Sequence, residues 1–253
     1  MKPVEFEALL SALTSDRQPR VWSLLVTLFG DLAQDAEAQI TGTTLSAITS
    51  ALGIKPEAMR VALHRLRRDG WIESERVGRR STYRLTERGR AESAGATPRI
   101  YATRPTEGAV WLVLSDPAGP DADAAEGVAI APGLWLAPQA GQQTTEMSFP
   151  IMAGHPLPAW MRAQLCPPTV ADQARTLTRR LDALSRDLTA VPLDPAQVAA
   201  LRVFVVHDWR RFVLRTPALP DHVFGPDWPG TACRAAVAEV LARLPRPPLS
   251  AFD

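Results

Sequence analysis

The stretch from Gly53 to Ile72 reads GIKPEAMRVALHRLRRDGWI, and it decides how the chain is organised. Pro56 suits the first position of a helix, where no backbone N–H is needed, and Gly70 suits the left-handed position just past a helix end. At roughly 100° per residue the side chains between them separate into two faces. The apolar face holds Met59, Ala62, Leu63 and Leu66, and the other face holds Glu57, Arg60, Val61, His64 and Arg68. The stretch therefore predicts a short helix with one core face and one free face.

Two flanking segments place this helix in a larger motif. Residues 44–52 carry Leu45, Ile48 and Leu52 at helical spacing and lead into a glycine turn. Residues 71–77 and 81–85 read as two strands joined by Gly78-Arg79-Arg80, a hairpin with a basic tip. A supporting helix, a turn, a second helix and a basic hairpin are the order of a winged helix-turn-helix.

Positive charge is concentrated in this region. Residues 55–90 hold eleven Lys and Arg against five Asp and Glu, whereas the net charge of the whole chain is +1. Double-stranded DNA requires such a surface, although a charged helix face is more often plain solvated surface. We expect DNA contacts from Lys55, Arg60, Val61, His64, Arg65, Arg68, Arg79 and Arg80. Arg60 and His64 are expected nearest the base edges, with Arg79 and Arg80 at the flanking backbone or minor groove.

Length and composition exclude several classes of protein. With 253 residues, 46% of them hydrophobic, the chain can form two or three globular domains. No apolar run approaches the roughly 20 residues of a membrane span, and the start lacks a signal-peptide core, so we expect a cytoplasmic protein. Cys166 and Cys233 are far apart and in no metal-binding pattern. We therefore expect no disulfide, no metal and no cofactor.

Outside the basic region, the pattern alternates between helical and β-like. Helices are expected at 4–13 and 21–30, one or two helical turns at 85–92, and a linker at 93–98. Trp111 and Trp135 are expected on the packed face of a small sheet. Its β-like runs are 100–102, 110–114, 128–130, 133–137 and 144–150, with a short helix in the acidic segment 116–126.

From Leu157 onward the pattern is helical. Helices are expected at 169–189, 194–215 with Asp194 as N-cap, and 232–244, before Pro245 to Pro248 end the ordered structure. We therefore expect an α+β multidomain protein. Its domains are an N-terminal winged helix-turn-helix (residues 1–94), a central α+β domain (99–156) and a helical C-terminal domain (157–253).

A heptad stripe runs along the helix expected at 169–189. Its members are Val170, Ala174, Leu177, Leu181, Leu184 and Leu188. The seam is narrow and suits one helical partner, which the next helix supplies with Val198, Leu201, Val205 and Phe212. We expect the seam to be buried inside each subunit, with a dimer-forming coil as the alternative. A homodimer is expected in either case, built by the domains after Arg99, because two-fold operators match two-fold proteins.

Several passages of the sequence resemble the PaaX-like repressors, regulators of bacterial phenylacetic acid catabolism. These are residues 23–31, 65–71, the hairpin, 207–220 and the passage Pro226-Asp227-Trp228-Pro229-Gly230. The resemblance implies a winged helix, a central ferredoxin-like domain similar to the CRISPR-associated Cas2 proteins, and a helical C-terminal domain. It also implies a homodimeric repressor that phenylacetyl-CoA releases from double-stranded operator DNA.

An acyl-CoA effector needs arginines for its phosphates and an apolar pocket for its acyl group. The richest combination in the sequence is Trp209, Arg210, Arg211, Arg215 and Trp228. These arginines could instead pair with Asp208, Asp221 and Asp227 and hold the proline-rich loop.

Two other classes of function stand beside a regulator. His207, Asp208, His222 and Asp227 could bind a metal or act as acid and base, but their spacings match no metal or nucleophile motif, so no catalytic residue is assigned. Because the central domain is expected to be Cas2-like, a metal-dependent nuclease is a further alternative. Its candidate residue is Asp116, which follows the strand expected at 110–114. A structural adaptor is the third class, and it leaves the basic face without a purpose.

Overall fold

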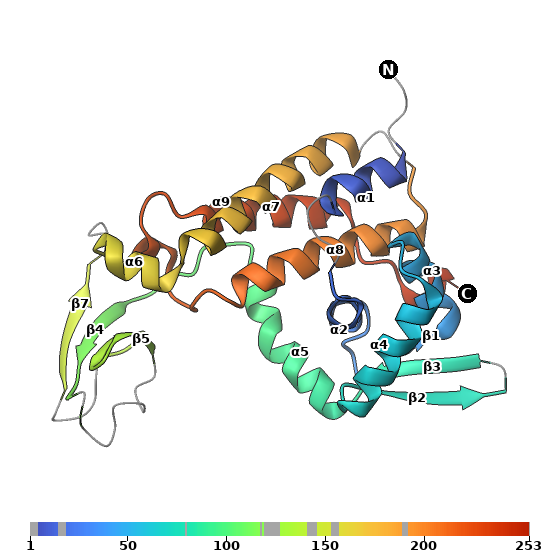
Figure 1. Cartoon of the computed structure of the whole chain (residues 1–253), viewed down its shortest axis with the longest axis horizontal. Coiled ribbons are helices and arrows are strands. Elements are labelled where there is room, and N and C mark those ends of the chain that lie inside the picture. The colour runs from blue at the N-terminus through green and yellow to red at the C-terminus, as the bar shows by residue number, and fades with distance from the viewer. Residues whose placement is uncertain are drawn as a thin grey trace. The chain divides into compact units, whose positions relative to one another are not determined.

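The computed structural model describes residues 5–14, 19–78, 80–116, 118, 127–140, 146–152, 157–188 and 192–252 (Figure 1). The protein is α+β, and its described residues form two small antiparallel sheets. It divides into two compact units. The first comprises residues 1–101, 177–211 and 236–253, and the second comprises residues 102–176 and 212–235.

The N-terminal part of the first unit contains the predicted helices and hairpin. Its elements are α1 (Phe6–Thr14), α2 (Val21–Leu32), β1 (Ile40–Thr41), α3 (Gly42–Ala51), α4 (Pro56–Arg68), β2 (Ile72–Val77), β3 (Arg80–Leu85) and α5 (Glu87–Ile100). The strands form a sheet in the order β1-β3-β2. The two-residue strand β1 was not predicted, because so short a segment is extended only through its pairing with β3.

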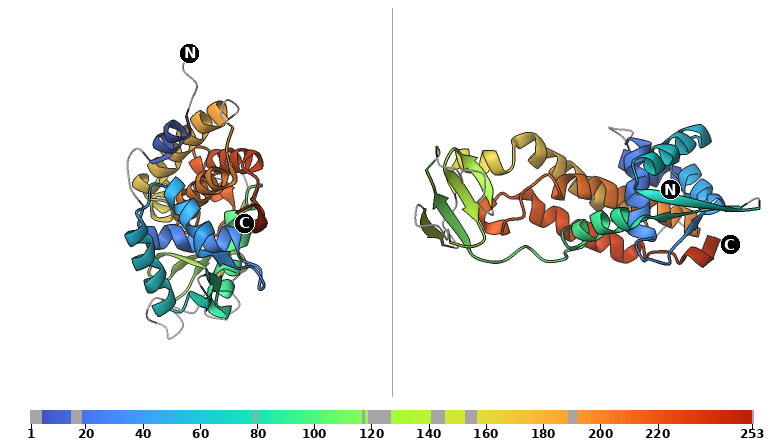
Figure 2. Two further views of the ribbon diagram at one scale, coloured as in Figure 1. Left: turned by 90° about the vertical axis from the view of Figure 1, so that its right-hand side faces the viewer. Right: turned by 90° about the horizontal axis from the view of Figure 1, so that it is seen from below.

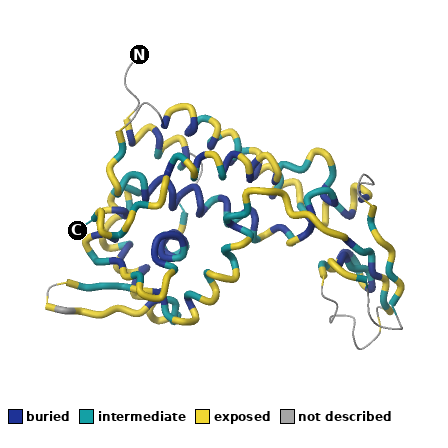
Figure 3. The backbone as a smooth tube through the Cα atoms, turned by 180° about the vertical axis from the view of Figure 1, so that it is seen from behind, coloured by how far each residue is buried: buried dark blue, intermediate teal, exposed yellow. Residues whose placement is uncertain are grey.

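Helix α2 lies at the centre of this part of the core. Leu25, Leu28 and Phe29 are fully buried, and α2 is seen end-on in dark blue in Figure 3. Helices α4 and α5 both contact it. Because α4 packs on α2 and α3 with its apolar side, its basic side is left at the surface.

Residues 93–98 are helical, which corrects both the predicted linker and the predicted strand at 100–102. Helix α5 runs unbroken to Ile100 and includes Pro98 near its end. Thr97 accepts a hydrogen bond from the Gln34 side-chain amide at 3.0 Å, and Ile100 is buried. These tertiary contacts hold a segment of small residues in a helix, although its weak apolar periodicity resembles that of a linker.

The second unit is built on the sheet β5-β6-β4-β7, in which every neighbouring pair is antiparallel. Its elements are β4 (Val110–Leu114), β5 (Val128–Ala131), β6 (Leu134–Ala137), β7 (Met147–Ile151), α6 (Ala159–Leu165) and the 3-10 turn η2 (Asp221–Phe224). The predicted strands at 110–114, 128–130 and 133–137 are confirmed. Most of the predicted helix at 116–126 falls on residues 117 and 119–126, and the start of the predicted strand falls on 144–145; both lie outside the described residues.

The core of the second unit lies on the leucine face of this sheet and not on the predicted tryptophan face, although Val113 and Ala137 on the tryptophan face are also buried. Leu112 pairs with Leu136 and Val113 pairs with Trp135, so the tryptophans and the leucines lie on different faces. The core of the unit contains Val110, Ile130, Leu136, Leu157, Met161, Leu165, Leu219, Val223 and Phe224, and it lies on the leucine face. Trp111 and Trp135 are half-buried on the other face. The central strand is apolar on both faces, so alternation alone could not identify the face that packs.

Three long helices confirm the predicted helical region, and each contributes residues to both units (gold, orange and red in Figure 2). They are α7 (Pro168–Asp187), α8 (Pro195–Val213) and α9 (Pro229–Arg243). Asp194 caps α8 as predicted, because its Oδ1 accepts the N–H of Gln197 at 2.9 Å. The heptad stripe from Val170 to Leu188 is buried, as expected. The 3-10 turn η3 (Leu249–Phe252) follows the prolines, which corrects the expectation that ordered structure ends there.

Candidate nucleic-acid interface

Helix α4 has strong boundary signals at both ends. Pro56 stands in its first turn. At the other end Gly70 adopts the left-handed conformation, with φ 70°. The N–H of Trp71 donates to the carbonyl of Leu66 at 2.9 Å, and the N–H of Gly70 donates to the carbonyl of Arg67 at 3.1 Å. This pair of bonds is a Schellman motif, which satisfies the last carbonyls of a helix. The helix is thus defined by its own sequence at both ends.

The outer face of α4 is exposed and basic, with one apolar side chain in its middle. Val61 has 70% of its surface exposed, while Met59, Leu63 and Leu66 of the same helix are buried. An isolated valine in water contributes nothing to folding, whereas a thymine methyl group in the DNA major groove would offer it an apolar contact.

The predicted DNA-contact residues that the structure describes are all exposed. Lys55 precedes α4, while Arg60, Val61, His64, Arg65 and Arg68 lie on it and Arg80 opens β3. Arg79 lies outside the described residues. Arg67 is also exposed, and the sequence prediction left it out. It stands seven residues after Arg60, a spacing that returns to the same helix face and could have identified it.

Weak ion pairs hold several of these arginines in place. Arg60 pairs with Glu57 at 2.9 Å, and Arg65 and Arg68 both approach Asp69 at 3.3 Å. Exposed pairs of this kind contribute about 0–1 kcal/mol, so a phosphate can replace the carboxylate at little cost. Arg65 also lies over the Trp22 ring of α2, 5.0 Å from its centroid. This cation–π contact orients Arg65, and no spacing rule in the sequence predicts it.

The hairpin is bonded directly to the end of α4. The Thr86 hydroxyl donates to the carbonyl of Gly70 at 2.7 Å, and the Thr86 N–H donates to that of Trp71 at 3.0 Å. The same hydroxyl accepts the N–H of Gly89 and so caps α5. A Cβ at Gly89 would lie 2.2 Å from the Trp71 carbonyl oxygen, so only glycine permits this approach. Helix α4, the hairpin and the start of α5 are therefore fixed relative to one another.

A buried ion-pair network joins α2 to the C-terminal helices of the same unit. Arg202 of α8 donates to both oxygens of Asp31, at 2.7 and 3.0 Å, and to the carbonyl of Leu244 at 2.8 Å. The Tyr101 hydroxyl donates to Asp31 at 2.6 Å, and Arg246 approaches the same carboxylate at 3.3 Å. Burial, followed by the charge of Asp31 and its hydrogen bond, raises the pKa of Tyr101 far above its usual value. The hydroxyl thus stays protonated as a donor.

The five residues proposed from the sequence for an effector are divided between the two units. Trp209, Arg210 and Arg211 belong to the first unit, and Arg215 and Trp228 belong to the second. Trp209 is buried, and its indole N–H donates to the Ile100 carbonyl at 2.8 Å, so it serves the core. Arg210 is half-buried and donates to the Thr27 hydroxyl at 3.1 Å.

Of the His and Asp groups considered for catalysis, His207 contacts a side chain of α2. His207 Nδ1 lies 3.2 Å from Thr27 Oγ1, and burial, with Arg210 and Arg211 nearby, lowers the pKa of His207 to about 3. The imidazole is therefore neutral at physiological pH. Asp221 pairs with Arg234 at 2.9 Å rather than with Arg210, Arg211 or Arg215. Among the residues that the structure describes, no group of three or more His, Cys, Asp and Glu is placed to hold a metal ion.

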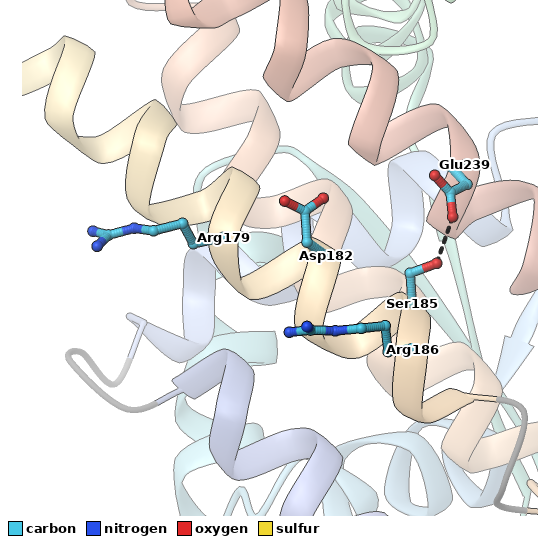
Figure 4. Close-up of a pocket in the computed structure, with 5 residues that line it drawn as sticks. All are labelled: Arg179, Asp182, Ser185, Arg186 and Glu239. Atoms are coloured by element: carbon cyan, nitrogen blue, oxygen red, sulfur yellow. Dashed lines mark hydrogen bonds between the residues drawn. The ribbon is translucent and has the colours of Figure 1, made fainter.

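A shallow groove lies between α7 and α9 in the first unit (Figure 4). Its lining residues are Arg179, Asp182, Ser185, Arg186 and Glu239. Ser185 donates to Glu239 at 2.5 Å, and the two arginines extend away from Glu239. Among the described residues, two cations and two anions line the groove, so their charges favour neither an anion nor a cation.

Two parts of the sequence match one family. Residues 20–89, which hold α2 to β3 and the start of α5, match the model described as PaaX-like protein, and residues 168–250 match that of the PaaX-like protein C-terminal domain. The chain belongs to the PaaX-like protein family. The two PaaX-like matches include the exposed face of α4 and both partners of the Asp31–Arg202 pair.

This PaaX-like chain is also similar to a curated protein, the transcriptional repressor PaaX of Escherichia coli (strain K12). The two are 27% identical over 256 residues, which cover 88% of this chain and 79% of the relative. In the part of the chain that the structure describes, no helix is long and apolar enough to cross a membrane.

Proposed function

We propose that this protein is a transcriptional repressor that binds operator DNA and controls genes of phenylacetate catabolism. The observation that carries the proposal is the exposed basic face of α4, held by α2, α3 and the hairpin within a region that matches the PaaX-like family. The similarity to the E. coli repressor supports the regulatory role.

In this proposal α3 and α4 form the helix-turn-helix, and β2 and β3 form the wing. Helix α4 has 13 residues and is about 20 Å long, which suits the major groove. Arg60, Val61 and His64 face the base edges. Lys55, Arg65 and Arg68 contact phosphates, and Arg79 and Arg80 at the wing tip contact the flanking backbone or minor groove.

A homodimer binds the operator. Because the heptad seam of α7 is already buried within the chain, the dimer interface is assigned to other surfaces of the residues after Arg99. The division into domains at 1–94, 99–156 and 157–253 and the Cas2-like, ferredoxin-like architecture of the central sheet stay predictions.

The effector is an acyl-CoA ester such as phenylacetyl-CoA, and it releases the protein from DNA. The contacts between α2 and α8 support a route for this release. Arg210 and His207 of α8 both meet Thr27 of α2, and Arg202 of α8 holds Asp31 of α2. A change at α8 thus reaches α2, against which α4 packs.

A gel-shift titration with DNA from upstream of the protein's own gene tests this proposal. We expect the upstream duplex to bind more tightly than a random duplex of the same length, with affinity falling as salt rises. Phenylacetyl-CoA is expected to release the complex, whereas free phenylacetate is not. Equal affinity for both duplexes would refute operator recognition.

The nuclease alternative has a direct test. Asp116 is exposed, and its Oδ1 accepts the N–H of Ala118 at 2.9 Å. Magnesium-dependent hydrolysis of nucleic acid that is lost in Asp116→Ala would replace the repressor proposal. Absence of both DNA binding and hydrolysis would favour the structural adaptor.

A further inference from the structure

The second unit contains a cavity of about 230 Å³. Its walls are α6, the start of α7 and the loop from Phe224 to Pro229. This loop contains the Asp-Trp-Pro passage that supports the family resemblance, and the cavity lies in a different unit from α4.

Two arginine side chains line the cavity, and one of them has no partner among the residues that the structure describes. Arg162 of α6 is half-buried, and its guanidinium makes no hydrogen bond or ion pair with the described residues. Its side chain lies against Gly225, where a Cβ would come within 3.1 Å of the guanidinium. Arg175 of α7 pairs with the exposed Asp172 at 2.8 Å, a weak pair that an anion can displace.

The ends of two long helices add to the positive potential. Pro168 is the first residue of α7 and Pro229 is the first residue of α9, and both line the cavity. The N-terminus of a helix carries a partial positive charge that favours anions. The lining also includes one carboxylate, Asp227, which is exposed.

An aromatic pair forms the apolar wall. Trp228 stacks on Phe224 with ring centroids 4.1 Å apart. Its indole lies over Gly230, where a Cβ would come within 2.4 Å of the ring, so glycine is required beneath it. The ring is therefore held in a fixed position beside the arginines.

We propose that this cavity binds the phosphate group of a small organic molecule, held by Arg162 and Arg175, with Trp228 contacting an adjoining apolar part. Pockets that enclose drug-sized ligands have volumes of about 300–1,000 Å³. A cavity of this size takes one end of a larger molecule or a small phosphate ester. If the molecule is the proposed acyl-CoA effector, the inference rests on the proposed function; the phosphate site itself stands on the geometry alone.

Isothermal titration calorimetry of the full-length protein tests the site. The probes are inorganic pyrophosphate, coenzyme A and phenylacetyl-CoA, and the variants are Arg162→Gln and Arg175→Gln. Arg179→Gln is the matched control, because it removes the same charge from an exposed position of α7 outside the cavity. We expect Arg162→Gln to weaken binding at least about tenfold, the loss for one charge-assisted contact, and Arg179→Gln to leave it within about twofold.

The variant Asp227→Asn distinguishes two roles of Arg162, binding a ligand and pairing with Asp227. If Arg162 serves to neutralise Asp227, then Asp227→Asn should lower the melting temperature and leave pyrophosphate affinity unchanged. If the cavity binds phosphate, Asp227→Asn should raise that affinity. Circular dichroism of each variant is the control for correct folding.

The outcomes distinguish the site from the proposed function. Binding of phenylacetyl-CoA that is unchanged in Arg162→Gln and Arg175→Gln overturns the site and leaves the effector proposal standing. Arginine-dependent binding of pyrophosphate without any binding of the CoA compounds keeps the site and overturns the acyl-CoA effector. No heat with any probe overturns the site.

Discussion

The carboxylate of Asp31 accepts two hydrogen bonds from the Arg202 guanidinium, at 2.7 and 3.0 Å, although the two residues are 171 positions apart in the sequence. The Asp31 side chain is 0% exposed and that of Arg202 is 7% exposed. Removing one partner from such a pair leaves a charge buried without compensation, which is strongly destabilising. Since Asp31 belongs to α2 and α4 packs on α2, the pair links the candidate DNA-binding surface to α8.

Asp31→Ala is therefore expected to lower the free energy of unfolding by about 3–5 kcal/mol, measured by urea denaturation. The matched control is Asp172→Ala, which breaks the exposed pair with Arg175 and should cost less than about 1 kcal/mol. The double variant Asp31→Leu with Arg202→Met should recover much of the loss, because it removes both charges together. If Asp31→Ala and Asp172→Ala lowered the free energy of unfolding equally, the buried pair would contribute no more to stability than the exposed one.

Substitutions on α4 and on the hairpin should affect DNA binding differently. Arg60→Ala should reduce operator affinity by about 1–3 kcal/mol and relax sequence preference, because Arg60 is assigned to base edges. Arg80→Ala should weaken binding to all duplexes alike and reduce the salt dependence, because it removes a phosphate contact. The same is expected for Arg79→Ala. Fluorescence anisotropy with operator and random duplexes measures both, and equal losses on the two duplexes for Arg60→Ala would contradict its assignment.

Alanine substitutions at two glycines of α5 should change stability in opposite directions. Gly89→Ala places a Cβ 2.2 Å from the Trp71 carbonyl oxygen, so it should lower the melting temperature and disturb the junction of α4 with the hairpin. Gly95→Ala meets nothing within 4 Å and should raise stability by about 0.5–1 kcal/mol, because alanine favours the helix. Scanning calorimetry decides between them. A harmless Gly89→Ala would mean that α5 and Trp71 can separate without cost.

Stability should fall on acidification because of His207. Its pKa of about 3 in the folded protein lies below the ordinary 6.5. The unfolded chain therefore binds a proton between these pH values that the folded protein does not. This group favours the folded state fully above pH 6.5, and the contribution declines as pH falls, by about 1.4 kcal/mol per pH unit. Urea unfolding of wild type and His207→Gln from pH 7 to pH 5 tests this, with a shallower decline expected in the variant. Parallel curves would show that His207 does not titrate differently in the two states.

The seam of α7 is expected to stabilise the subunit rather than to join two subunits. Leu181 is fully buried, so Leu181→Glu should unfold the helices around it, with loss of the circular dichroism signal. Arg179→Glu, exposed on the same helix, is the control and should remain folded. Light scattering of a folded, monomeric Leu181→Glu protein would instead identify the seam as the dimer interface.

The local sequence was sufficient to predict the helix and hairpin of the candidate DNA-binding surface. Pro56, Gly70 and the apolar spacing of Met59, Leu63 and Leu66 act within a few residues of one another, so their effect could be read locally. The glycine turn of the hairpin and the Asp194 cap of α8 were predictable for the same reason. Helix caps and turns depend on the backbone next to them, which is why the predicted boundaries of these elements agree with the structure.

Which distant residues contact one another could be read from the tertiary structure but not from the sequence. The tertiary structure made a helix of residues 93–98, chose the leucine face of the β4–β6 pair for packing, and placed Arg65 over Trp22. It also gave Asp31 its partner and left Arg162 without one among the described residues. The physical reason is that these outcomes depend on which surfaces are buried together. A charged side chain or an apolar strand has the same local sequence whether its partner is solvent, a neighbouring helix or a ligand.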